Sequence, residues 1–264
     1  QQHVKEENAK PYDQLKGGYI YALLVKLRAR TSGSLVAHAG QLAHAALFKW
    51  FAEVDSAFAE ILHEPNLRRP FTCSTLIMPT RDGSRTSASS FDMIQAGETY
   101  WIRFTLLSEQ LFQMFIARYM QIVVPTLQGV QLPALRLGGI GFDVLDVVTG
   151  PTGPTGVHDL QHEAVLRWSG AITYEKLVDQ ACLHILPVKA QHIGMEFCSP
   201  TTFSRGHSAG KRQFLLFPEP ERVFDTLAHS WNCWAPDAYC IDTHALQRYI
   251  QEWVIVASYD LLTH

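Results

Sequence analysis

The order of secondary structure in the first half of the chain constrains its fold more than any other feature. Apolar segments with strand composition alternate with segments whose apolar residues recur every three or four positions, as in amphipathic helices. The predicted strands are 18–30, 71–78, 98–107 and 135–148, and the predicted helices are 39–54 and 109–123. Their order, strand, helix, strand, strand, helix, strand, defines the ferredoxin-like (RRM-type) sandwich. A short additional helix is expected between Asp55, its N-cap, and His63.

The second half repeats the mixture of helices and strands after a clear break. GPTGPTG (150–156) is the strongest linker signal, because repeated Gly and Pro suit neither helix nor strand. We therefore predict an α+β fold with two tandem ferredoxin-like (RRM-type) domains. The expected organisation is a lead-in at 1–17, a first domain at 18–149, a linker at 150–157 and a second domain, incomplete at its C-terminus, at 158–264. In the second domain we expect helices at 174–184, at 221–234 and after Asp242 or Thr243, and strands at 191–203 and 252–262.

Composition narrows the function classes. The 264 residues carry a net charge of −3, so local clusters must supply the positive field if nucleic acid is the ligand. No apolar run reaches the roughly 18 residues that span a bilayer, and no membrane partner is expected. The five scattered cysteines without a C-x-x-C predict a reducing, cytoplasmic location. Because the chain does not begin with Met, it is expected to be a processed chain, a fragment or part of a longer polypeptide.

Three histidines around the first helix are candidates for acid–base chemistry. His38, His44 and His63 carry imidazoles, which titrate near neutrality, so a pair can act as base and acid in one turnover. With RNA as substrate, the 2′-OH is the nucleophile and Arg68 or Arg69 can hold the phosphate. The alternative is structural: His38 as a turn residue and His44 as a core histidine.

A second cluster is basic. The predicted loop 204–213 contains Arg205, Lys211 and Arg212, and no acidic residue lies between Ser199 and Phe217. It can grip a phosphate backbone, or it is an ordinary solvated loop. No set of cysteines and histidines has the spacing of a zinc site, and no metal or other cofactor is expected.

Several segments resemble CRISPR-associated repeat-RNA endoribonucleases of the Cas-six type, in the RAMP superfamily. The resemblance rests on an apolar strand, a Ser-Pro-Thr-x-Phe turn and a Pro-x-Pro segment before a helix ending in Trp-Asn. These features stand in GMEFCSPTTFSRG (194–206) and FPEPERVFDTLAHSWN (217–232). In the first half, GQLAHAALFKWF (40–51), FAEILHEPNLRRPFTCSTL (58–76) and TYWIRFTLLSEQLF (99–112) are similar to the first helix, the segment after it, and the third strand with the second helix.

The resemblance implies a function and a site. Members of this family cut CRISPR repeat RNA without a metal ion, leaving a 2′,3′-cyclic phosphate and a 5′-OH. His63 takes the place of the histidine after the first helical hairpin, and Arg69 that of a lysine shortly after it. His44, with His38 behind it, takes the place of the residue on the first helix. The expected RNA contacts are Arg68, Arg205, Lys211 and Arg212.

Other readings stay open. A repeat-RNA-binding subunit of a CRISPR effector or adaptation complex would share the fold and leave the RNA intact. A scaffold would have the fold alone and no affinity for RNA. The Gly-rich loop that the family carries near its C-terminus has no counterpart after Leu262. Some family members are fused to reverse transcriptase and integrase domains, so such a fused partner is one expectation.

Overall fold

The computed structural model describes most of the chain as two units. The described residues are 16–35, 39–64, 68–79, 85–87, 93–127, 135–150, 169–183, 194–195, 197, 203–208, 211–215 and 217–259. Contacts divide the chain into Gln1–Gln180 and Ala181–His264. Among these residues no helix is both long enough and apolar enough to cross a membrane.

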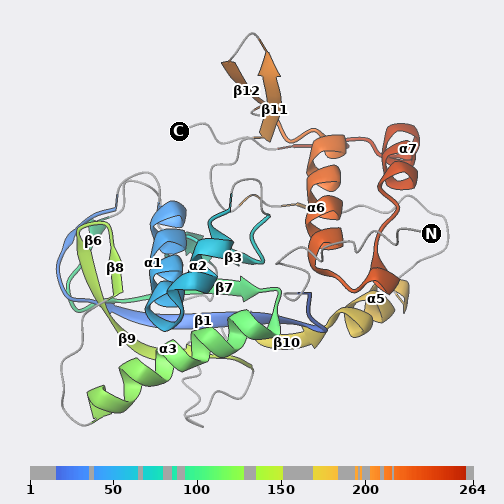
Figure 1. The fold of residues 1–264 in the computed structure, drawn as a ribbon. Helices are drawn as coiled ribbons and strands as arrows, with labels where there is room; N and C mark the ends of the chain where they lie inside the picture. Colours follow the sequence, from blue (N-terminus) through green and yellow to red (C-terminus); the bar gives the residue numbers. More distant parts are fainter. Residues whose placement is uncertain are drawn as a thin grey trace, which may run out of the picture. The chain divides into compact units, whose positions relative to one another are not determined.

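Strand β1 (Tyr19–Ala29) is the centre of the first unit (Figure 1). It pairs antiparallel with β7 (Thr99–Leu106) on one side and with β9 (Ile140–Val148) on the other. The strand order is β5 (Arg85–Ser87), β4 (Ile77–Pro79), β7, β1, β9 and β8 (Leu135–Leu137). With helices between β1 and β4 and between β7 and β8, this is the predicted ferredoxin-like order. A separate two-stranded ladder joins β2 (Gly33–Ser34) to β6 (Met93–Ile94).

Two helices cover one face of this sheet. Helices α1 (Ala39–Val54) and α3 (Glu109–Leu127) pack against each other, and an ion pair between Glu53 and Arg118 links them. The core between helices and sheet holds Leu23, Val25, Leu27, Trp50, Ile102, Phe104 and Phe115. The boundaries predicted for α1 are confirmed. Helix α2 (Ser56–Leu62) follows, and the Asp55 carboxylate accepts a hydrogen bond from the backbone N–H of Phe58 (3.0 Å), as predicted for an N-cap.

The predicted strand 71–78 is two strands in the structure. Strands β3 (Phe71–Cys73) and β4 (Ile77–Pro79) both pair with β7. The Ser74 hydroxyl accepts the backbone N–H of Arg103 (2.9 Å), so a side chain replaces one step of the ladder. The break between β3 and β4 at Ser74 therefore resembles a β-bulge, and apolar periodicity along one strand does not reveal such a break. Strand β5 (Arg85–Ser87) pairs with β4, in a segment where no strand was predicted.

The end of the first unit adds a strand that the sequence analysis missed. Strands β8 (Leu135–Leu137) and β9 form a hairpin within the predicted strand 135–148, with Gly138 and Gly139 between them. Strand β10 (Gly170–Thr173) pairs with the first residues of β1. Helix α5 (Tyr174–Leu183) follows directly, and the Thr173 hydroxyl accepts a hydrogen bond from the backbone N–H of Lys176 (3.0 Å). Except for Gly150, the predicted linker 150–157 lies outside the described residues, and the domain boundary there stays a prediction.

The second unit contains a hairpin and two helices. Strands β11 (Phe203–Ser208) and β12 (Lys211–Leu215) pair antiparallel where the sequence predicts a basic loop. Only two residues separate them, and such short Gly-containing connections are typical of hairpins. Helices α6 (Pro220–Trp234) and α7 (Thr243–Trp253) pack together, with the short helix η3 (Asp237–Tyr239) between them. The Asp242 side chain caps α7, as predicted.

The predicted strand 252–262 is wrong in its described part. Helix α7 continues to Trp253, and residues 254–259 have no strand assignment. Val254 is extended (φ −101°, ψ 121°), and Ile255 is 84% exposed. β-branched residues favour an extended backbone, but a strand also requires a neighbouring strand that supplies hydrogen-bond partners.

The Trp-Asn pair at the end of α6 holds the turn to α7. The Trp231 indole N–H donates to the carbonyl of Tyr239 (2.7 Å). Asn232 makes two bonds with Ile241: its Oδ1 accepts the backbone N–H (2.7 Å) and its Nδ2 donates to the carbonyl (2.7 Å). The motif therefore has a structural role in the unit that contains it.

We expect Asn232→Ala to destabilise this turn by about 1–2 kcal/mol, because both bonds to Ile241 are lost. The amide proton of Ile241 should then exchange with solvent faster. Asn232→Asp keeps the acceptor and should preserve most of the protection. Unchanged exchange in Asn232→Ala would show that these two bonds do not hold the turn.

Candidate functional site

The two candidate histidines that the structure describes lie on neighbouring helices, His44 on α1 and His63 at the end of α2. His44 is in the second turn of α1, and Phe48 follows one turn later on the same face, as the spacing of four residues dictates. His63 is the C-cap of α2 (φ −87°, ψ −7°), directly after the last helical residue. Arg69 precedes β3, which begins at Phe71. The helical hairpin and the first residues of β3 therefore bring these side chains to one place.

The Phe48 ring is the centre of this group. The His63 imidazole stacks on it with ring centroids 4.0 Å apart and an interplanar angle of 25°. The His44 imidazole is tilted against it at 4.7 Å. Phe71 meets it edge-on at 5.3 Å and lies 5.0 Å from His44. Both imidazoles are thus held against one aromatic ring, although they come from different helices.

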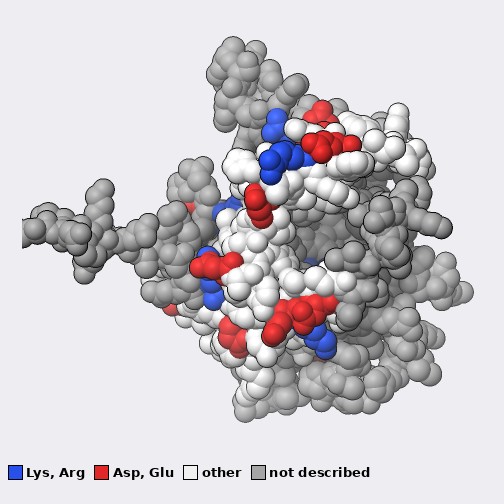
Figure 2. All heavy atoms as spheres, turned by 90° about the vertical axis from the view of Figure 1, so that its right-hand side faces the viewer, with Lys and Arg blue, Asp and Glu red and all other residues white. Residues whose placement is uncertain are grey.

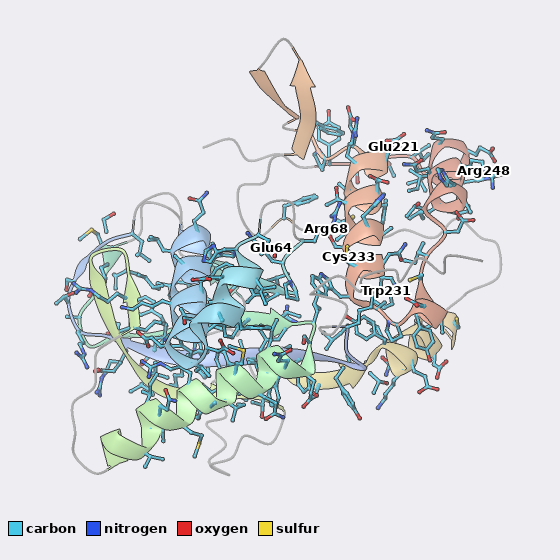
Figure 3. The ribbon with its side chains drawn as sticks, in the orientation of Figure 1. Glu64, Arg68, Glu221, Trp231, Cys233 and Arg248 are labelled. Carbon is cyan, nitrogen blue, oxygen red and sulfur yellow. The ribbon has the colours of Figure 1, made fainter. Side chains whose placement is uncertain are left out.

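Arg69 joins the group from the connection between α2 and β3. Its guanidinium carbon lies 5.5 Å from the Phe48 ring centroid, within the range of a cation–π interaction. Its Nη1 also donates to the backbone carbonyl of Glu64 (3.3 Å). Figure 3 labels Glu64 and Arg68 on this connection. A cation is therefore fixed beside the two histidines by both a ring face and a backbone acceptor.

The surroundings of His44 favour its neutral form. Burial lowers the pKa of His44 below its ordinary value of 6.5, and the charges of Arg69 and His63 lower it further. His44 is half-buried and His63 is exposed. At neutral pH, His44 therefore has a free ring nitrogen that can accept a proton.

The other predicted site residues have different outcomes. His38 lies outside the described residues. Arg68 is half-buried beside Arg69 in the chain. The backbones of Arg205, Lys211 and Arg212 lie in the β11–β12 hairpin, where Arg212 pairs with His207 and Lys211 with Ser208. Their side chains are not among those that the structure describes.

Sequence reasoning missed Phe48. Its spacing from His44 was visible as a shared helix face, but its contacts with His63, Arg69 and Phe71 join residues up to 23 positions further along the chain. No local pattern carries that information.

Charges on the visible face are mixed. Figure 2 shows small groups of basic and acidic side chains among uncharged residues, without a broad field of one sign on the described residues of that face. Within the described part of the chain, no three His, Cys, Asp or Glu side chains are grouped so that they could hold a metal ion.

Comparisons with known proteins agree with this architecture. Residues 19–130 match the CRISPR Cas6 N-terminal domain family. No match was found among curated proteins. Thermus thermophilus Cas6, solved as a product complex, has a similar fold, with a TM-score of 0.57 and 20% identity over 88% of this chain and 73% of that chain. The product of a Cas6-related gene from Pyrococcus furiosus has a TM-score of 0.47 and 10% identity over 83% of this chain and 73% of that chain.

The likeness to the Thermus protein concerns the fold, and it confirms the predicted α+β class of the tandem ferredoxin-like type. The family match adds that residues 19–130 are similar to the CRISPR Cas6 N-terminal domain.

Proposed function

We propose that this protein is an endoribonuclease that cuts CRISPR repeat RNA by attack of the 2′-OH, without using a metal ion. The observation that carries the proposal is the convergence of His44, His63 and Arg69 on the Phe48 ring. The Cas6 N-terminal domain and the fold shared with a Cas6 product complex supply the substrate class. Two imidazoles and one cation are the groups that this reaction requires.

The roles follow from the environment of each group. Neutral His44 takes the proton from the 2′-OH, because its pKa is lowered by burial and by the nearby positive charges. The 2′-oxygen forms a bond to phosphorus while the bond from phosphorus to the 5′-oxygen breaks. His63, the more exposed imidazole, gives a proton to the departing 5′-oxygen. Arg69 stabilises the negative charge that develops on the phosphate. The products are a 2′,3′-cyclic phosphate and a 5′-OH.

A second candidate function uses the same fold without cleavage. In it, the protein binds repeat RNA as a subunit of a CRISPR effector or adaptation complex, or as part of a fusion with reverse transcriptase and integrase domains. The observation in its favour is that both imidazoles pack against aromatic rings, as structural histidines also do.

Cleavage of an end-labelled repeat RNA in EDTA separates the two functions. We expect one cut, which disappears when the nucleotide at the cut carries a 2′-deoxy sugar. His63→Ala should lower the cleavage rate at least tenfold and leave RNA binding nearly unchanged, because an acid–base catalyst contributes about 10²–10⁴-fold to the rate.

His44→Ala should have a similar effect. The control is His229→Ala, which removes an exposed histidine of α6 in the second unit. Binding without cutting by the unaltered protein would favour the RNA-binding subunit. Full activity of His63→Ala would remove this residue from the mechanism.

The pH dependence tests the assignment of His44 as the base. Because the pKa of His44 lies below 6.5, the decline of kcat/KM on the acidic side should be centred at a pH below 6.5. Arg69→Gln removes one cause of the lowered pKa, so the pKa of His44 should rise and the acidic limb should move to higher pH. Titration of the imidazole protons by NMR gives the pKa directly. The control is Arg68→Gln, which removes a neighbouring charge and should leave the pKa of His44 unchanged. If the pKa of His44 does not rise in Arg69→Gln, the assignment is contradicted.

The basic hairpin is proposed to bind the RNA backbone. The change of Arg205, Lys211 and Arg212 together to Ala should weaken binding of repeat RNA. It should also reduce the slope of log K against log salt by about 0.7 for each phosphate contact that is lost. Lys176→Ala, which removes an exposed lysine of α5, is the control for loss of charge alone. An unchanged slope would exclude the hairpin from the RNA contact.

A further inference from the structure

Phe48 lies beneath the proposed catalytic groups. Its side chain is only 5% exposed, so an RNA base has no access to its ring. Instead, four side chains from separate places in the sequence meet it: His44, His63, Arg69 and Phe71. Any influence of Phe48 on cleavage must therefore pass through these neighbours.

We propose that Phe48 is the positioning residue of the site: its ring fixes the orientation of the His63 imidazole and of the Arg69 guanidinium relative to His44. This inference rests on the proposed endoribonuclease function. It assigns to an apolar residue a role that neither its burial nor its chemistry alone indicates.

The geometry explains why a ring is required. His63 is exposed and lies at the end of α2, and its imidazole stacks on the Phe48 ring. A nearly parallel stack at 4.0 Å restricts the plane of the imidazole, whereas an aliphatic side chain offers no flat face. The same ring attracts the Arg69 cation through its π electrons. Burial of volume alone reproduces neither interaction.

The position of the ring is itself well defined. Phe48 is one turn from His44 on α1, so the helix sets the distance between them. Phe71, at the start of β3, meets the ring at an interplanar angle of 75°. The backbone pairing of Phe71 with Leu106 ties that contact to the central sheet. Phe48 therefore links the geometry of α1 and the sheet to the side chains of His63 and Arg69, which lie outside both elements.

The test compares Phe48→Leu, which keeps an apolar side chain, with Phe48→Tyr, which keeps the ring face. We expect Phe48→Leu to lower the single-turnover cleavage rate of repeat RNA at least tenfold with Kd changed less than twofold. Phe48→Tyr should restore the rate to within about threefold of the unaltered protein. Phe115→Leu is the matched control, because it makes the same change in the core beside Trp50, away from both histidines. It should cleave within twofold of the unaltered protein.

A structural measurement separates this inference from the proposed function. The ring protons of His63 should show nuclear Overhauser contacts to residue 48 and a ring-current shift, both lost in Phe48→Leu and kept in Phe48→Tyr. If the unaltered protein does not cut RNA, the proposed function fails, and with it the catalytic meaning of the arrangement. If it cuts and Phe48→Leu cuts equally fast, the positioning role is overturned. If Phe48→Leu does not fold, Phe48→Met, which is flexible and similar in volume, replaces it with the same expected loss.

Discussion

The pairing of β1 with strands on both of its sides is the constraint on which the first unit depends. Leu23, Leu24, Val25 and Leu27 are fully buried, so both faces of the strand are covered and its register cannot slip without exposing them. From β1 the register passes to β7, where Leu106 pairs with Tyr21 on one side and with Phe71 on the other. The central sheet thus places Phe71 beside the helical hairpin that carries the candidate histidines.

The candidate site is built from apolar packing with charged groups at its edge. An aromatic ring brings two imidazoles and a guanidinium together without a direct bond among them. Their proximity has an electrostatic consequence, because neighbouring positive charges and burial both disfavour a protonated His44. The same packing that orders the groups therefore favours the neutral form of His44, which is the form that the proposed general base needs.

In the second unit, the sequence motifs that resemble the family have structural roles. Its Pro-x-Pro segment leads into α6, with Pro220 at the first helical position, where a missing N–H costs nothing. Trp231 and Asn232 hold the turn to α7 through three hydrogen bonds to backbone groups. These residues made the family resemblance visible, and their role is to shape the unit. The residues proposed to act on RNA lie in the first unit and in the hairpin.

The sequence by itself determined the local elements. It predicted the bounds of α1 and the cap of α2 at Asp55, because apolar periodicity and capping side chains act over a few residues. Tertiary structure alone decided the break at Ser74, the pairing of β10 with β1 and the helical end of α7 at Trp253. It also placed Phe48 between His44 and His63. Each of these outcomes depends on which backbone group or aromatic ring from a distant part of the chain is available as a partner. Local sequence patterns do not specify such partners.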